Sequence, residues 1–223
     1  MATKRTCLKD RILPDYTRGE EIFNMVTHIV GGAIGVATLV FCIILPALSG
    51  NVTGVLCGIM FGVSMIFLYT MSSVYHGLRR GMAKKVFQIM DHCSIYWLIA
   101  GTYTPVLVCS VARDYPLSAW VTFGLVWGLA IVATVLTAID LRKYRAFSMI
   151  CYISMGWAII FSMKQAYLSL GNGGFFWILL GGLLYTGGVF FFCKNTRYFH
   201  SIFHIFVVLG SICHSVAVIF YIM

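Results

Sequence analysis

Residues 199–222 read FHSIFHIFVVLGSICHSVAVIFYI, a run of 24 residues without Asp, Glu, Lys or Arg. As an α-helix, this run would measure about 36 Å, enough to cross the ~30 Å hydrocarbon core of a bilayer. His200 and His204 lie near its start at i and i+4, so they share one helix face. One helix can offer two imidazoles to a metal ion at this spacing. Taken alone, the pair is at least as typical of histidines that face lipid headgroups.

The rest of the chain repeats such apolar runs. Of its 223 residues, 60% are hydrophobic and 10% are charged, whereas soluble domains carry about 25% charged residues. The runs lack the alternation of barrel strands, so we predict an all-α integral membrane protein, a seven-transmembrane helix bundle. Residues 1–19 would form a short basic segment, and residues 20–223 the single transmembrane domain. The expected spans are roughly 24–48, 52–76, 88–111, 117–139, 146–168, 174–193 and 199–222.

The basic residues predict the orientation of these spans. Of the 16 Lys and Arg residues, 14 lie before the first span or in the connections that share its side of the membrane. By the positive-inside rule, the N-terminus is cytoplasmic and the C-terminus is outside. The net charge of +9 is thereby explained by topology, so we expect no nucleic-acid partner. The predicted localisation is the cell membrane, as a multi-pass protein.

Small residues indicate how the helices pack. The eight cysteines form no CxxC pair and fall mostly inside apolar runs, so we expect packing thiols and no structural disulfide. Pro105 lies inside the third span and should kink it, freeing the carbonyl of Gly101. Three glycine pairs at i and i+4 predict close helix contacts. These pairs are Gly31 with Gly35, Gly58 with Gly62, and Gly124 with Gly128.

Polar side chains inside the spans are candidates for function, because they are costly in a bilayer. Ser72 and His76 end the second span, Asp91 begins the third, and His200 and His204 begin the seventh. The predicted topology puts all five at the cytoplasmic side. Three imidazoles and one carboxylate from three helices therefore reach the same depth.

Three histidines with a fourth position left to water are the ligand set of catalytic zinc, so we predict Zn²⁺ bound by His76, His200 and His204. Few soft thiolates lie at this depth, which disfavours copper and iron–sulfur clusters. Zinc-bound water ionises near pH ~7, and Asp91 would accept its proton. Ser72 would hold the water or polarise a carbonyl. The alternatives are that His76 is an interfacial histidine and that Asp91 caps the third span.

Further polar residues surround this set. Glu20, Asn24 and His28 lie at the cytoplasmic end of the first span. They would support the ligand histidines through hydrogen bonds, or they form a polar cap on that span. His214 lies fourteen residues after His200, ~21 Å deeper, too far to bind the same ion. It would line an internal cavity or satisfy a polar contact near the outer leaflet.

These motifs together resemble the hemolysin III family of the progestin and adiponectin receptor superfamily. The resemblance rests on Glu20-x₃-Asn24-x₃-His28, residues 72–76 (SSVYH), Asp91-His92, residues 100–105 (AGTYTP) and His200-x₃-His204, and it covers nearly the whole chain. It implies seven helices, an inside N-terminus, zinc on the three histidines, and Asp91 and Ser72 around the zinc-bound water. We expect no counterpart of the long N-terminal domain of the adiponectin receptors, so their hormone role is not carried over.

Three functions follow as hypotheses. The first is a zinc-dependent hydrolase of a lipid amide or ester, ceramidase-like, whose partner is a membrane lipid or fatty-acyl substrate. The second is a lipid sensor or membrane-homeostasis protein in which zinc only joins the second and seventh spans. The third is a cytolysin, which the family name implies, although pore formers are usually soluble before they insert.

Overall fold

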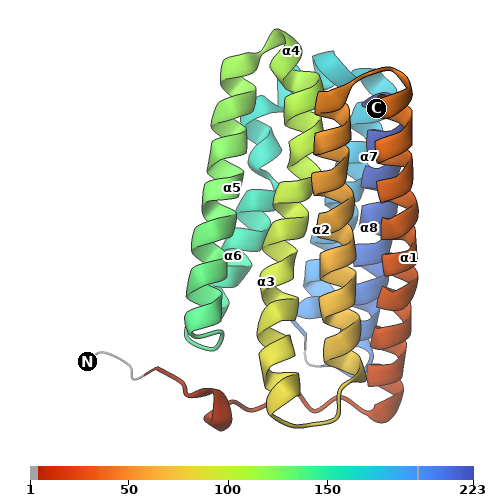
Figure 1. Cartoon of the computed structure of the whole chain (residues 1–223). Coiled ribbons are helices and arrows are strands. Elements are labelled where there is room, and N and C mark those ends of the chain that lie inside the picture. The colour runs from red at the N-terminus through yellow and green to blue at the C-terminus, as the bar shows by residue number, and fades with distance from the viewer. Residues whose placement is uncertain (1–4, 195) are drawn as a thin grey trace.

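The computed structural model describes residues 5–194 and 196–223, and every regular element within them is a helix. The helices stand side by side in an upright bundle (Figure 1). The long helices are α1 (Arg18–Leu48), α2 (Val52–Gly77), α3 (Met82–Pro105), α5 (Pro116–Ile139), α7 (Met163–Phe192) and α8 (Phe199–Tyr221). The short ones are η1 (Leu8–Asp10), η2 (Val106–Val111), α4 (Ala112–Asp114), α6 (Arg145–Gly156) and η3 (Ala158–Ser162).

Helix α1 begins six residues before the expected first span, because a capping box sets its start. The Glu20 amide donates to the hydroxyl of Thr17 at 3.3 Å, and the Thr17 amide donates to the Glu20 carboxylate at 2.8 Å. Two N–H groups that the first turn would leave unpaired are thereby satisfied. The helix therefore extends past the apolar run into polar sequence, and it carries Glu20 and Glu21 with it.

Pro105 ends α3, and a helix of a different type follows it directly. Proline lacks the N–H that would bond to the carbonyl of Gly101. The next six residues, Val106–Val111, form a π-helix, which keeps the chain helical while changing its register. At the position of the expected kink, the structure thus has a wider helical turn.

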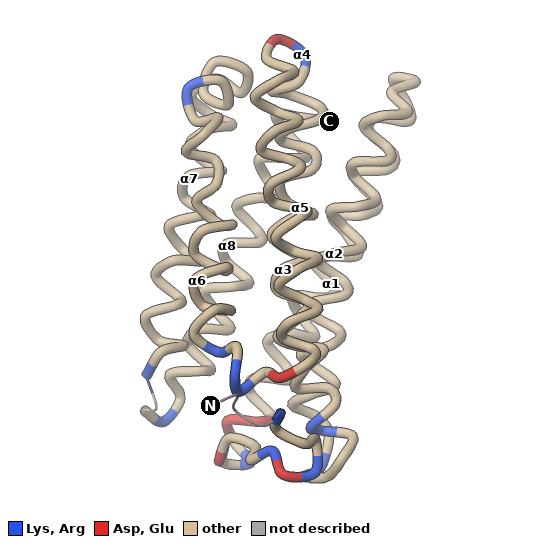
Figure 2. The backbone as a smooth tube through the Cα atoms, turned by 90° about the vertical axis from the view of Figure 1, so that its left-hand side faces the viewer, with Lys and Arg blue, Asp and Glu red and all other residues tan. Residues whose placement is uncertain are grey.

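The described residues contain six helical stretches long and apolar enough to cross a membrane. Figure 2 shows the charged residues gathered toward the two ends of the bundle, with an uncharged stretch between them. The stretch Arg145–Phe192 counts as one of the six, and it holds the fifth and sixth expected spans. It is interrupted by η3 and by Gly171, whose φ of 65° and ψ of −178° are not helical. The structure therefore shows an integral membrane helical bundle with six candidate spans.

Glycines set the close approach of α1 and α2. A Cβ atom on Gly58 would overlap the carbonyl oxygen of Cys42, and one on Gly62 would lie 2.6 Å from the Cβ of Leu39. The first two predicted glycine pairs therefore do mark a tight interface. The third pair does not, because a Cβ on Gly124 or Gly128 meets nothing within 4 Å.

The segment before α1 runs across one end of the bundle (Figure 1), and we call residues 5–17 the N-terminal strap. The Thr6 amide donates to the Asp140 carboxylate at 2.7 Å, which ties the strap to the connection between α5 and α6. Arg80 donates to Asp15 at 2.6 Å, which ties it to the connection between α2 and α3. Backbone N–H groups outweigh the effect of burial and lower the pKa of Asp140, so this anchor is a carboxylate at neutral pH.

We predict that Gly58→Ala destabilises the protein whereas Gly124→Ala does not. The added methyl group at position 58 forces α1 and α2 apart, at a cost of about 1–3 kcal/mol. This lowers the thermal unfolding midpoint by several degrees, by the usual ~2–4 °C per kcal/mol. Thermal unfolding of both variants in the same detergent tests this, and equal midpoints would contradict the packing described here.

Candidate metal centre

The structure brings together His76 from the end of α2 and His200 and His204 from the start of α8. One nitrogen of each ring lies within 4.8 Å of the others. The Nε2 atoms of His200 and His204 are 3.1 Å apart. His76 and His204 are buried, with 3% and 1% of their surface exposed, and His200 is partly buried. Three imidazoles from two helices thus point at one small volume.

This donor set fits a divalent ion. Two nitrogens bound to one tetrahedral zinc at 2.0–2.1 Å would be about 3.3 Å apart, close to the observed separation of His200 and His204. The Nε2 atom of His76 is buried and has no hydrogen-bond partner among residues 5–194 and 196–223. A buried nitrogen of this kind requires a partner. A metal ion between the three rings would supply it.

The orientation of His76 is set from α1. His76 Nδ1 lies 2.7 Å from the Glu21 carboxylate, which can only accept, so Nδ1 carries the hydrogen and Nε2 keeps its lone pair for a ligand. Lys84 contacts the other oxygen of Glu21 at 2.9 Å and donates to the carbonyl of Tyr75 at 2.9 Å. Only 2% of Lys84 is exposed. This histidine–carboxylate–lysine chain fixes both the ring and the carboxylate behind it.

Three further contacts near the cluster tie α1 to α8 and to the residue just before it. Nδ1 of His204 lies 3.3 Å from the backbone oxygen of Asn24, which again directs Nε2 toward the cluster. The Asn24 side chain accepts a hydrogen bond from Ser201 at 2.7 Å. Glu20 accepts one at 2.7 Å from the amide of Tyr198, the residue that precedes α8 and has a left-handed φ of 62°. Of the three expected supporting residues, Asn24 contacts a cluster histidine directly, and Glu20 positions the start of its helix.

His28, the third expected supporting residue, contacts the cluster by stacking. Its ring lies 3.7 Å from that of His204, centroid to centroid, and the two planes differ by 12°. Both of its ring nitrogens are buried and lack a hydrogen-bond partner in the described chain. His28 therefore holds the His204 ring on its face and places a fourth imidazole beside the three.

Ser72 and Asp91 line a small pocket together with His200 and His204. Ser72 is buried, and its hydroxyl has no hydrogen-bond partner within the described residues. Asp91 is partly buried, and 13% of its side chain is exposed. The structure thus places both residues at the space in front of the histidines, as the topology predicts.

The strap places a residue that the sequence analysis did not single out against two of the cluster histidines. The Tyr16 ring stacks on the His200 ring, with centroids 5.0 Å apart and planes 19° apart. Its centroid is also 5.7 Å from that of His76. Burial and the nearby carboxylates of Asp91 and Glu21 raise the pKa of Tyr16 above its ordinary value, so its hydroxyl stays protonated. Tyr16 is therefore a neutral aromatic cover over the histidines.

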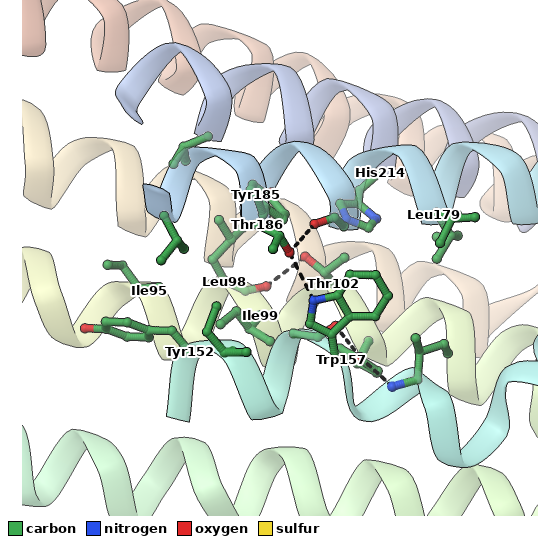
Figure 3. Close-up of a pocket in the computed structure, with 18 of the residues that line it drawn as sticks. Ile95, Leu98, Ile99, Thr102, Tyr152, Trp157, Leu179, Tyr185, Thr186 and His214 are labelled. Carbon is green, nitrogen blue, oxygen red and sulfur yellow. Dashed lines mark hydrogen bonds between the residues drawn. The ribbon is translucent and has the colours of Figure 1, made fainter. Parts of the chain in front are cut away.

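A larger and mostly apolar cavity adjoins the pocket, between α3, α6, α7 and α8 (Figure 3). The two spaces share five lining residues, which are Leu68, Ile95, Phe192, Phe203 and Val207. The histidine cluster thus lies at one end of a long apolar space.

The sequence model of the haemolysin-III related family matches residues 16–215, a range that includes every residue of the site described above. The chain belongs to the haemolysin-III related family. Together with the six candidate spans among the described residues, this membership shows a multi-pass membrane protein, consistent with the cell membrane.

Two bacterial relatives match nearly the whole chain, and a human one matches a shorter part of it. The protein is 37% identical over 205 residues to Hemolysin-3 of Bacillus cereus, and the match covers 92% of each chain. It is 37% identical over 210 residues to the Hemolysin-3 homolog of Bacillus subtilis (strain 168), across 92% of this chain and 96% of that one. It is 27% identical over 167 residues to the Monocyte to macrophage differentiation factor of Homo sapiens, across 71% and 67%.

For this haemolysin-III related protein, we predict that Glu21→Gln weakens metal binding about 10–100-fold, the usual effect of removing a carboxylate behind a ligand histidine. Asp15→Asn makes the same chemical change in an ion pair whose Asp15 side chain is 96% exposed, and it should leave the affinity unchanged. Competition with a fluorescent zinc chelator measures both variants. Equal affinities for Glu21→Gln and the wild type would show that Glu21 does not support the site.

Proposed function

We propose that this protein binds Zn²⁺ through His76, His200 and His204 and hydrolyses an amide or ester bond of a membrane lipid. The observation that carries the proposal is the cluster of His76, His200 and His204, because His200 and His204 also line a pocket together with Ser72 and Asp91. A zinc ion held by three histidines supplies a nucleophile from water at neutral pH and polarises a carbonyl.

The side chains around the pocket have separate roles in this proposal. Asp91 accepts a proton from the attacking water and delivers it to the leaving amine or alcohol. The free hydroxyl of Ser72 donates a hydrogen bond to the carbonyl oxygen, where negative charge develops. Tyr16, stacked over His200, excludes bulk water from this side.

The adjoining cavity favours a lipid substrate. Its lining is mostly aliphatic and aromatic, and it shares residues such as Phe203 and Val207 with the metal pocket. An acyl chain in this cavity would place its carbonyl group near the histidines. We therefore propose a lipid with a long acyl chain as the substrate, whether a ceramide-like amide or an ester.

We also propose that Arg145–Phe192 crosses the membrane twice, giving seven spans with the N-terminus in the cytoplasm. As one straight helix its 48 residues would measure about 72 Å, more than twice the bilayer core. The non-helical Gly171 supplies a point at which the chain can reverse. The excess of Lys and Arg on the side of the strap supports a cytoplasmic N-terminus.

Cysteine labelling tests this topology in a variant without the two exposed thiols, Cys7 and Cys193. We expect a membrane-impermeant maleimide to label Asn172→Cys on intact cells, because exposed Asn172 follows the non-helical Gly171, where we propose that the chain reverses. Lys143→Cys, between α5 and α6, should react only after the cells are permeabilised. Labelling of both positions from the same side would refute the second crossing.

For activity, we predict that purified wild type contains one zinc per chain and releases fatty acid from a ceramide-like or related acyl lipid. His204→Ala should lose both the zinc and the activity. Asp91→Asn should keep the zinc and lose about 10²–10⁴-fold in rate, the usual effect of a proton-transfer group. Asp114→Asn, the same change in an exposed residue of α4, is the matched control. Metal analysis and mass spectrometry of the products provide the two measurements.

A second candidate function is a lipid sensor in which the ion only joins α2 to α8. The supply of ligands by these two helices favours it. In that case His204→Ala lowers the thermal unfolding midpoint, and Asp91→Asn changes neither the midpoint nor the zinc content. Full zinc occupancy without turnover of any acyl lipid would favour this sensor over the hydrolase.

A further inference from the structure

A second polar group faces the apolar cavity far from the metal centre. His214 of α8 lines the cavity, and 6% of its surface is exposed. Its Nδ1 atom is buried and has no hydrogen-bond partner among the residues that the structure describes. A buried imidazole nitrogen without a partner is costly, so something that enters the cavity should supply one.

The other polar side chains that line the cavity already have hydrogen-bond partners, and Figure 3 draws several of these bonds. Thr102 donates to the carbonyl of Leu98 at 2.8 Å. The Thr186 hydroxyl donates to the carbonyl of Gly182 at 2.8 Å and accepts from the Trp157 indole at 3.0 Å. Among these groups, His214 is the one that retains an unpaired ring nitrogen.

The ring of His214 is held in place. It stacks on Tyr185, with centroids 5.4 Å apart and planes 22° apart. The Tyr185 hydroxyl in turn pairs with Ser211 at 2.8 Å. On another side, the ring lies against Gly181, where an added Cβ would come within 2.7 Å of Nε2. A glycine at this position leaves the room that the imidazole occupies.

The distance from the metal centre defines what this group can recognise. His214 follows His204 by ten residues, about 15 Å along α8. Between them the cavity is lined mainly by apolar side chains, such as Leu98, Ile99 and Val207. A ligand that extends from the histidine cluster along the cavity therefore meets a single unpaired polar group, in the far part of its chain.

We propose that His214 recognises a hydroxyl group on the acyl chain of the lipid that this cavity binds. A neutral imidazole has one donor and one acceptor nitrogen, and a hydroxyl can pair with either. The ligand is then a hydroxylated acyl lipid, with the hydroxyl about 15 Å from the group at the metal centre. The inference rests on the proposed binding of an acyl chain in this cavity, but not on hydrolysis.

Binding of positional isomers tests the proposal in the full-length protein. The probes are palmitic acid and hydroxypalmitic acids that carry the hydroxyl either next to the carboxyl group or in the far half of the chain. These isomers have the same composition, so they differ mainly in where the hydroxyl lies. We expect the far-half isomer to bind about tenfold more tightly than the near isomer, the effect of one well-made buried hydrogen bond.

Two variants separate recognition from packing. His214→Phe keeps an aromatic ring against Tyr185 but removes both nitrogens, so the preference between isomers should disappear while palmitic acid still binds. Gly181→Ala keeps the histidine and displaces its ring, and it should reduce the preference in the same way. Gly181→Ala also provides an independent test if His214→Phe does not fold.

The outcomes are distinct. If the wild type binds palmitic acid but prefers neither isomer, the proposed role of His214 is wrong, and water is the partner of its ring nitrogen. The proposal that the cavity binds an acyl chain is not affected by this outcome. A preference that persists in His214→Phe or Gly181→Ala overturns the role of His214 too. If no fatty acid binds, the acyl-chain cavity fails along with this inference.

Discussion

The hydrogen bonds between the first turns of α1 and the two histidine-bearing helices are what the site depends on. Glu21 bonds to His76 on α2, Asn24 bonds to His204 and Ser201 on α8, and Glu20 bonds to the chain just before α8. Inside an apolar bundle these polar groups have few other partners, so the contacts are specific. Because α1 touches both helices, it fixes the rotation of each about its own axis. The cluster is therefore a property of three helices, although two supply its nitrogens.

Much of this arrangement follows from hydropathy and charge. The apolar runs predict the helices, and the ends of α2, α5 and α8 lie within one or two residues of the expected bounds. The distribution of Lys and Arg along the chain predicts that four residues lie at the same end of the bundle, namely His76, Asp91, His200 and His204. Depth in a membrane is a one-dimensional quantity that a sequence records directly. For this reason the convergence of these residues could be predicted before their contacts were known.

Contacts that depend on helix rotation could not be predicted in this way. Glu20 and Glu21 lie at the same depth but about 100° apart, and only packing decides that Glu21 is the one that reaches His76. Lys84 counts as a topology signal in the sequence, yet it is buried behind that carboxylate. The glycine pairs at Gly58 and Gly124 have the same spacing in the sequence. Only the rotation of each helix decides that the first pair packs tightly and the second faces open space. By contrast, the earlier start of α1 could have been predicted from the sequence, because Thr17 and Glu20 have the spacing of a capping box.

The strap has a consequence for how a bound ion would exchange. Tyr16 lies flat on His200, and the strap is anchored on both sides, at Asp140 and at Arg80. A chelator in the adjacent aqueous phase would contact the histidines only after the strap had moved away from His200. The half-life of the ion in a chelator solution would then report the opening rate of the strap and not the dissociation constant. Kinetic retention and thermodynamic affinity would thus be separate properties of this protein.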